Sequence, residues 1–397
     1  MQIEKVVDCT GCGACRSVCP VDAIVMQYDP SGFRYPHTDL TRCMDCGLCE
    51  KVCHLKKQSE PEKQRQQDDC AVYAAYLKET DELDSVSSGG VFWALAKRFI
   101  HENGVVYGVE QTSIFDVHHA RAETTDQCKP FRRSKYLESR VDDVYAPVKQ
   151  DLESGRLVLF SGVGCQISAL RQYLGKAYEG LYTCEVICHG IPSMALYKLY
   201  IAELEKKQGS RVIGVNFRVK SNGWKKNHIA YSFEDGSELC EFCGTNAFHC
   251  GYTAGYYYRP SCAACRSAKL PRVADITLAD FWRYQGKLLD SNPDRGISLV
   301  LCNTEKGKKA FSMIEDALCF EQSDMTGAIA SCHHLTHAPD NSRYRDRFIE
   351  EALLHGFEKT FARYHKRDHA RMKIKAIASI PLSAASKLKR AIKGMMK

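Results

Sequence analysis

The sequence predicts two folded parts: a short α+β module at the N-terminus and a longer mixed α/β domain behind it. Two observations predict this fold class. Two cysteine runs of identical spacing lie between residues 9 and 53, and from residue 71 onward short apolar strands alternate with helical segments. Such alternation is typical of α/β domains, because each helix covers the sheet that its flanking strands build.

The composition of the segments between these parts sets the boundaries. Residues 57–69 are rich in Lys, Gln and Glu, and we interpret them as a polar linker. We therefore divide the chain into the module at 1–56, the linker at 57–69, two parts of the α/β domain at 70–150 and 151–345, and a basic tail at 346–397.

Both cysteine runs read C-x2-C-x2-C-x3-C, the spacing of bacterial ferredoxins. In that arrangement the first three thiolates of a run hold one [4Fe-4S] cluster, and the fourth ligates the other cluster. The spacing predicts two clusters, one held by Cys9, Cys12, Cys15 and Cys53 and the other by Cys43, Cys46, Cys49 and Cys19. Zinc knuckles do not need this triple spacing, and disulfide frameworks belong to short secreted chains.

The segment between the two runs, residues 25–39, predicts a β-hairpin because turn-forming residues occupy 29–32. Each half of this module is too small to bury a core. We therefore expect a two-cluster, ferredoxin-like α+β module in which the metal stabilises the fold.

In the longer domain, apolar runs predict strands at 71–76, 105–109, 157–160, 181–187 and 212–219. Predicted helices cover 89–101, 165–174 and 195–206. Ser87, Ser88, Gly89 and Gly90 open the first of these helices. Free amides and small side chains at a helix start suit a phosphate group, although the same residues also serve as ordinary caps.

A second glycine cluster, Gly162 and Gly164, lies between a predicted strand and a predicted helix. It lacks the third glycine of the dinucleotide fingerprint, and Glu185 lies near the expected position of a ribose-binding acid. These residues keep a nicotinamide-linked reductase open as an alternative.

A further set of cysteines predicts a third metal site. Cys262 and Cys265 form a C-x2-C knuckle, Cys165 lies in the turn after Gly164, and Cys188 follows a predicted strand. Electron relays need metal sites close together, so we expect these four thiols to hold a third [4Fe-4S] cluster, with Cys184 as a reserve ligand.

The basic charge is concentrated in the tail, where residues 363–397 contain eleven Lys or Arg and one acid. Apolar residues between these charges predict short amphipathic helices that could lie on an anionic membrane surface. A solvated tail is the alternative, and its shortage of aromatic residues argues against nucleic acid. Neither a spanning segment nor a signal peptide is evident, so we expect a cytoplasmic protein, optionally peripheral at the inner membrane face.

The α/β domain resembles the coenzyme F420 hydrogenase/dehydrogenase beta-subunit family over roughly residues 70–320. The motifs that carry this resemblance are SSGGVFWAL from Ser87, RRSKYLES from Arg132, VGCQISAL from Val163, ICHGIPS from Ile187, CAAC from Cys262 and ADITLADFW from Ala274. The resemblance implies FAD, a cluster beside it, and hydride exchange with a deazaflavin coenzyme or another two-electron partner.

The resemblance also implies roles for individual residues. Ser87, Ser88, Gly89 and Gly90 would contact the flavin phosphates, Ser134, Lys135 and Tyr136 would line the flavin pocket, and Lys135 would be the catalytic candidate. We therefore expect an iron–sulfur flavoprotein oxidoreductase that exchanges electrons with a redox partner protein, either a ferredoxin or another subunit. The alternatives are an electron-transfer subunit without its own substrate site, a nicotinamide-linked reductase, and a scaffold with structural clusters.

Overall fold

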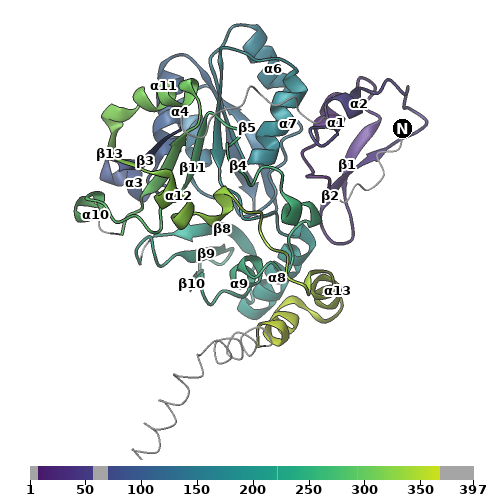
Figure 1. Cartoon of the computed structure of the whole chain (residues 1–397). Coiled ribbons are helices and arrows are strands. Elements are labelled where there is room, and N and C mark those ends of the chain that lie inside the picture. Colours follow the sequence, from purple (N-terminus) through teal and green to yellow (C-terminus); the bar gives the residue numbers. More distant parts are fainter. Residues whose placement is uncertain (1–7, 57–69, 221, 293, 367–397) are drawn as a thin grey trace, which may run out of the picture.

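The computed structural model describes residues 8–56, 70–220, 222–292 and 294–366 (Figure 1). The predicted linker at 57–69 and the basic segment at 367–397 lie outside the described residues, so the predicted amphipathic helices and their membrane contact stay predictions. Figure 1 shows the N-terminal module beside a large mixed α/β body, next to α6 (Tyr145–Glu153) and α7 (Gly164–Leu174).

The module contains one antiparallel hairpin and two short helices. Strands β1 (Ile24–Tyr28) and β2 (Arg34–Thr38) pair as the turn residues predict. Helices α1 (Ala14–Ser17) and α2 (Leu48–Lys51) each start after a glycine with φ of 70°, Gly13 and Gly47. A left-handed backbone of this kind suits glycine and lets each cysteine run turn tightly. The module is therefore α+β, as predicted.

An eight-stranded sheet forms the centre of the body, with strand order β13-β3-β12-β11-β7-β6-β4-β5. Its four central strands, β11, β7, β6 and β4, are parallel to one another, whereas β12 and β5 flank them in antiparallel register. The strand bounds are β3 (Ala71–Leu77), β4 (Val105–Ser113), β5 (Asp116–Ala122), β6 (Val158–Gly162), β7 (Leu181–Val186), β11 (Ile276–Asp280), β12 (Ser298–Cys302) and β13 (Leu318–Ser323).

Helices cover this sheet, and a smaller sheet lies beside it. The remaining α-helices are α3 (Thr80–Asp84), α4 (Val91–His101), α5 (Thr125–Cys128), α8 (Met194–Gln208), α9 (Ala247–Thr253), α10 (Leu288–Ser291), α11 (Glu305–Ser312), α12 (Met325–Ser331) and α13 (Arg345–His355). The small sheet has the order β10-β9-β8, with β8 at Val212–Val219, β9 at His228–Phe233 and β10 at Glu238–Phe242. All strands and helices predicted for the longer domain are confirmed within a few residues, and the mixed α/β class with them.

The folded body continues past residue 345, where we placed the start of a tail. The side chains of Phe348, Phe357 and Tyr364 are fully buried in an aromatic core beside α8 and α9. Residues 346–366 therefore belong to the body, because burying large rings stabilises this segment against the rest of the core. The same core includes Phe33 and Tyr35 of the module, so module and body share packed apolar surface.

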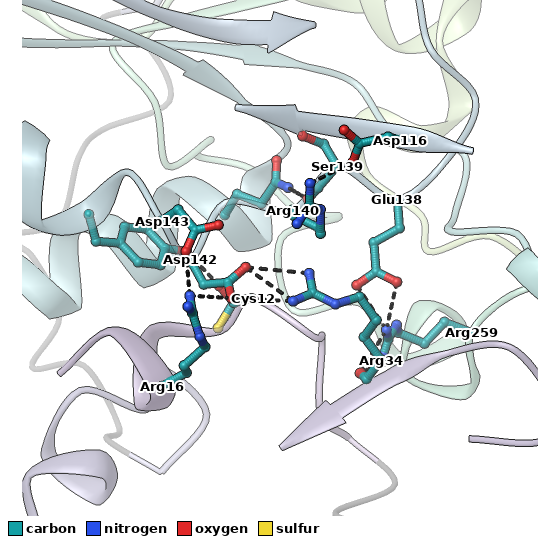
Figure 2. Close-up of polar contacts among 12 residues, drawn as sticks. Cys12, Arg16, Arg34, Asp116, Glu138, Ser139, Arg140, Asp142, Asp143 and Arg259 are labelled. Carbon is teal, nitrogen blue, oxygen red and sulfur yellow. Dashed lines mark hydrogen bonds and ion pairs between the residues drawn. The ribbon is translucent and has the colours of Figure 1, made fainter. Parts of the chain in front are cut away.

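Buried charged side chains also join the module to the body (Figure 2). The Arg259 guanidinium, on the body, is bound by Glu138 at 3.0 Å and donates to the backbone oxygens of Cys9 and Arg34 in the module. The Arg34 side chain in turn donates to Asp142, at 3.2 Å. All four of these charged side chains are more than nine-tenths buried. Charges removed from water in this way need their partners in place.

We expect Glu138→Ala to lower the thermal unfolding midpoint of the full-length protein by several degrees. The substitution leaves the Arg259 charge buried without its carboxylate, and breaking a buried pair of this kind costs about 3–5 kcal/mol. Differential scanning fluorimetry at one scan rate measures the midpoint. Asp126→Ala, which breaks an exposed ion pair with Lys129, is the control and should leave it unchanged. Equal midpoints for both variants would contradict a docking role for Glu138.

Candidate functional site

A large hollow lies where the four parallel strands end. Gly162 and Val163 after β6, residues 186–191 at and after β7, and residues 278–280 of β11 all line a cavity of about 470 Å³. The carboxyl edge of a parallel sheet is where open α/β folds bind ligands, because the loops diverge there. A cavity of this size can hold a cofactor-sized molecule.

The predicted phosphate-binding segment lies at this cavity, but its four residues differ in role. Ser87, Ser88 and Gly90 line the cavity, whereas Gly89 does not. The Gly89 N–H donates to the Ser298 hydroxyl at 3.0 Å, so that amide already has a partner. A Cβ atom at Gly89 would lie 2.2 Å from the Ala75 carbonyl oxygen. Gly89 is therefore required for packing between the segment and the sheet.

The three residues expected around the flavin, Ser134, Lys135 and Tyr136, all line the same cavity. The Ser134 N–H donates to the Ser87 hydroxyl at 2.9 Å, which ties the two predicted segments together. The Lys135 ammonium donates to the Val109 carbonyl oxygen at 2.7 Å. Burial lowers the pKa of Lys135 to about 7, because a charged ammonium is poorly solvated there. A buried lysine of this kind responds readily to an anionic ligand.

The structure brings together Cys165, Cys188, Cys262 and Cys265 around a second cavity, of about 200 Å³. Backbone N–H groups point at two of the sulfurs: Gly190 donates to Cys188 at 3.2 Å, and Ile191 donates to Cys262 at 3.4 Å. Four thiols with amide donors are a donor set that fits an iron–sulfur cluster. The reserve ligand Cys184 does not line this cavity and lies buried in β7.

Burial raises the pKa of Cys188 to about 12 and that of Cys262 to about 11. It also raises the pKa of Cys165 well above its ordinary value. Such thiols keep their protons at neutral pH, so metal binding must release those protons and stabilise the thiolates. A positively charged metal core supplies that stabilisation, which suits these thiols as metal ligands.

The two cavities share a wall. Val163, Cys188, Gly190, Ile191 and His334 each line both of them. A group held by the four thiols would therefore lie next to a ligand in the larger cavity, with Cys188 between them.

The module's cysteines lie in two groups, and their ligation of two clusters stays a prediction. Cys53 lies close enough to affect the titration of Cys9, Cys12 and Cys15, although it belongs to the other run. Likewise Cys19 lines one small hollow with Cys43, Cys46 and Cys49. The first set lies against the body: the Tyr145 hydroxyl donates to the Cys12 carbonyl oxygen at 3.0 Å. The second set is farther out, with Cys46 exposed.

The structure contradicts the proposed ribose-binding role of Glu185. This carboxylate is fully buried, forms an ion pair with Arg272 and accepts a hydrogen bond from Thr277 at 3.0 Å. It lines neither cavity. A Cβ atom at Gly164 would lie 2.5 Å from a Glu185 oxygen, so the glycine is needed to let α7 approach this ion pair. Gly164 is therefore explained by packing.

Several residues at the cavity were not predicted as site residues. Arg218, Trp282, His189, His333 and His334 all line it. They come from β8, from the ends of β7 and β11, and from the segment after α12, so their proximity depends on tertiary packing. Trp282 lies within the ADITLADFW motif and His189 within the ICHGIPS motif, and those positions were the signals available in the sequence.

Comparison with known proteins identifies both parts of the chain. Residues 155–327 match the family described as the C terminus of the coenzyme F420 hydrogenase/dehydrogenase beta subunit, and residues 8–56 match the 4Fe-4S dicluster domain. One chain of the F420-reducing [NiFe] hydrogenase complex from Methanosarcina barkeri is similar in structure, with 18% identity and a TM-score of 0.43 over 77% of this chain and 92% of that chain. No curated protein matches the sequence. None of the described helices has the length and apolar composition that a membrane span requires.

We expect Glu185→Gln to destabilise the protein without changing any preference between NADH and NADPH. The substitution leaves the buried Arg272 charge without its partner, which costs about 3–5 kcal/mol. Thermal midpoints and initial rates with each nucleotide would be compared with those of Glu153→Gln, a control at an exposed carboxylate. A normal midpoint together with an altered nucleotide preference would restore Glu185 as a ribose ligand.

Proposed function

Because the chain belongs to the coenzyme F420 hydrogenase/dehydrogenase beta-subunit family and carries a 4Fe-4S dicluster domain, we propose that it is an iron–sulfur flavoprotein oxidoreductase. In this proposal it passes electrons between a two-electron hydride partner and one-electron carriers. The observation that carries the proposal is the shared wall between the four-thiol cavity and the larger cavity. Bound FAD would supply the exchange between hydride and single electrons.

The larger cavity offers the groups that a flavin dinucleotide requires. Ser87, Ser88 and Ser134 offer polar contacts at the segment proposed for the phosphates, and Lys135 offers a cation close by. The cavity also favours an enzyme with its own substrate site over an electron-transfer subunit without one, because such a subunit does not need a hollow of this size.

The cysteine sets suggest an order for the proposed relay. The exposed set with Cys46 would face a redox partner protein, and the set with Cys12 lies at the interface with the body. The four-thiol cavity comes next and adjoins the flavin cavity through Cys188. The protein's own part is to fix these positions, which the Arg34–Asp142 ion pair and the Arg259 hydrogen bonds to the module would do.

We expect protein purified without oxygen to contain flavin and about twelve irons per chain, because three four-iron clusters account for that number. The double variant Cys262→Ser, Cys265→Ser should retain about eight irons, since both changes fall on one cluster. Iron analysis and visible absorbance measure the two cofactors. The matched control is Cys240→Ser, which replaces an exposed cysteine outside all three sets. A double variant that keeps all its iron would contradict the prediction of a third cluster. A wild-type protein without flavin would contradict the proposed function.

We expect FAD affinity to fall as the pH rises through about 7 and the fall to be absent in Lys135→Met. The pKa of Lys135 is lowered to about 7 by burial, and an anionic phosphate or flavin favours the charged ammonium. Binding therefore takes up a proton, so affinity is highest below that pH. Titrations of FAD fluorescence at a series of pH values on both sides of the Lys135 pKa would measure the dissociation constant. Parallel pH profiles for wild type and variant would place Lys135 outside the site.

A further inference from the structure

A buried histidine lies directly behind the wall of the larger cavity. His119 of β5 lines neither cavity, and its ring stacks on Phe160 of β6 with centroids 5.3 Å apart. Its Nε2 atom lies 2.9 Å from the Ser161 carbonyl oxygen, and its Nδ1 atom lies 2.8 Å from the Ser139 hydroxyl oxygen. Both serines line the larger cavity. His119 can therefore affect a ligand there through these serines.

The two contacts fix which ring nitrogen carries the hydrogen. Burial lowers the pKa of His119 to about 4, because a charged ring is poorly solvated there. The imidazole is therefore neutral at physiological pH and has one N–H. A carbonyl oxygen can only accept, so Nε2 must carry the hydrogen that it donates to Ser161. Nδ1 is then an acceptor, and the Ser139 hydroxyl must donate to it.

The Ser139 hydroxyl consequently has no hydrogen left for the cavity. Its oxygen can still accept, because a hydroxyl has one donor and two lone pairs. Ser161 is in the same position, since its hydroxyl donates to the Tyr107 carbonyl oxygen at 3.2 Å. Both hydroxyls thus offer only acceptors to a ligand, so this part of the wall suits a group with N–H donors.

These acceptors lie at the end of the cavity that adjoins the four thiols. The Gln166 side chain donates to the Ser139 carbonyl oxygen and accepts a hydrogen bond from the Val163 N–H, both at 3.1 Å. Val163 lines both cavities. In the proposed function the flavin ring lies at this shared wall, so the ring is the part of the cofactor that Ser139 would face.

The hydrogen-bonding groups of a flavin ring depend on its redox state. A hydride added to the ring forms an N–H bond at N5, where the oxidised ring has only a lone pair. An acceptor opposite that atom repels the lone pair but accepts a hydrogen bond from the N–H. A wall of acceptors therefore favours the reduced ring.

We propose that His119 is a positioning residue that makes this wall bind the reduced flavin ring more tightly than the oxidised ring. It does so by accepting the Ser139 hydrogen, which leaves an acceptor opposite the flavin. The stack on Phe160 and the Ser161 carbonyl hold the imidazole in the orientation that this requires. The inference rests on the proposed function and adds a determinant of the flavin reduction potential that lies outside the cavity.

The test is a redox titration of the bound flavin in full-length wild type, His119→Phe, Ser139→Ala and the double variant. Phenylalanine keeps a ring to stack on Phe160 but has no nitrogen to accept the Ser139 hydrogen. We expect each single variant to lower the preference for reduced over oxidised flavin about tenfold, which lowers the two-electron midpoint potential by about 30 mV. The double variant should match Ser139→Ala, because His119 acts through that hydroxyl.

Ser154→Ala is the matched control, because the Ser154 hydroxyl also donates to a carbonyl oxygen but lines neither cavity. Its midpoint potential should equal that of the wild type. Ser139→Ala removes a single oxygen and carries the test if His119→Phe does not fold. A wild-type potential in Ser139→Ala, or additive shifts in the double variant, would overturn the inference and leave the proposed function in place. Wild-type protein without bound flavin would contradict the proposed function, and the inference with it.

Discussion

The ion pair between Arg259 and Glu138 is the interaction on which the arrangement of the parts depends. Arg259 also holds the Cys9 and Arg34 carbonyl oxygens, so one buried cation connects the body to both the first cysteine run and the hairpin of the module. A surface salt bridge would be too weak for this purpose. Because the pair is desolvated, its loss is costly, and the module cannot move away as a freely tethered domain does.

The fixed position of the module matters because its thiols and those of the body are proposed to hold metal clusters. The Cys12 set touches the body through Tyr145, and Cys188 of the Cys165 set lines the larger cavity. Burial raises the pKa of the Cys12 and Cys165 thiols, because their charged form is poorly solvated away from water. Burial raises the pKa of core thiols such as Cys302 in the same way, so it is the grouping of the Cys165 set around one cavity that suits a metal.

The sequence predicted what local patterns determine. The repeated cysteine spacing indicated which of the module's cysteines lie together, and the apolar runs located three of the four parallel strands, β4, β6 and β7. It did not predict the role of residues 346–366, because their polar composition hides the few aromatic side chains that enter the core. Nor could it pair Glu138 with Arg259, which are 121 residues apart and meet only through tertiary packing. The ribose-binding role of Glu185 was predicted wrongly for the same reason, because its ion-pair partner Arg272 is distant in sequence.

The four-thiol cavity has walls from both parts of the chain. Thr10, His54 and Leu55 of the module line it together with Cys165 and Cys262 of the body. The Arg266 side chain on the body donates to the Leu55 carbonyl oxygen, at 2.8 Å, and helps to close that side. Because residues of both parts line it, this cavity takes its full shape only when the module and the body are docked.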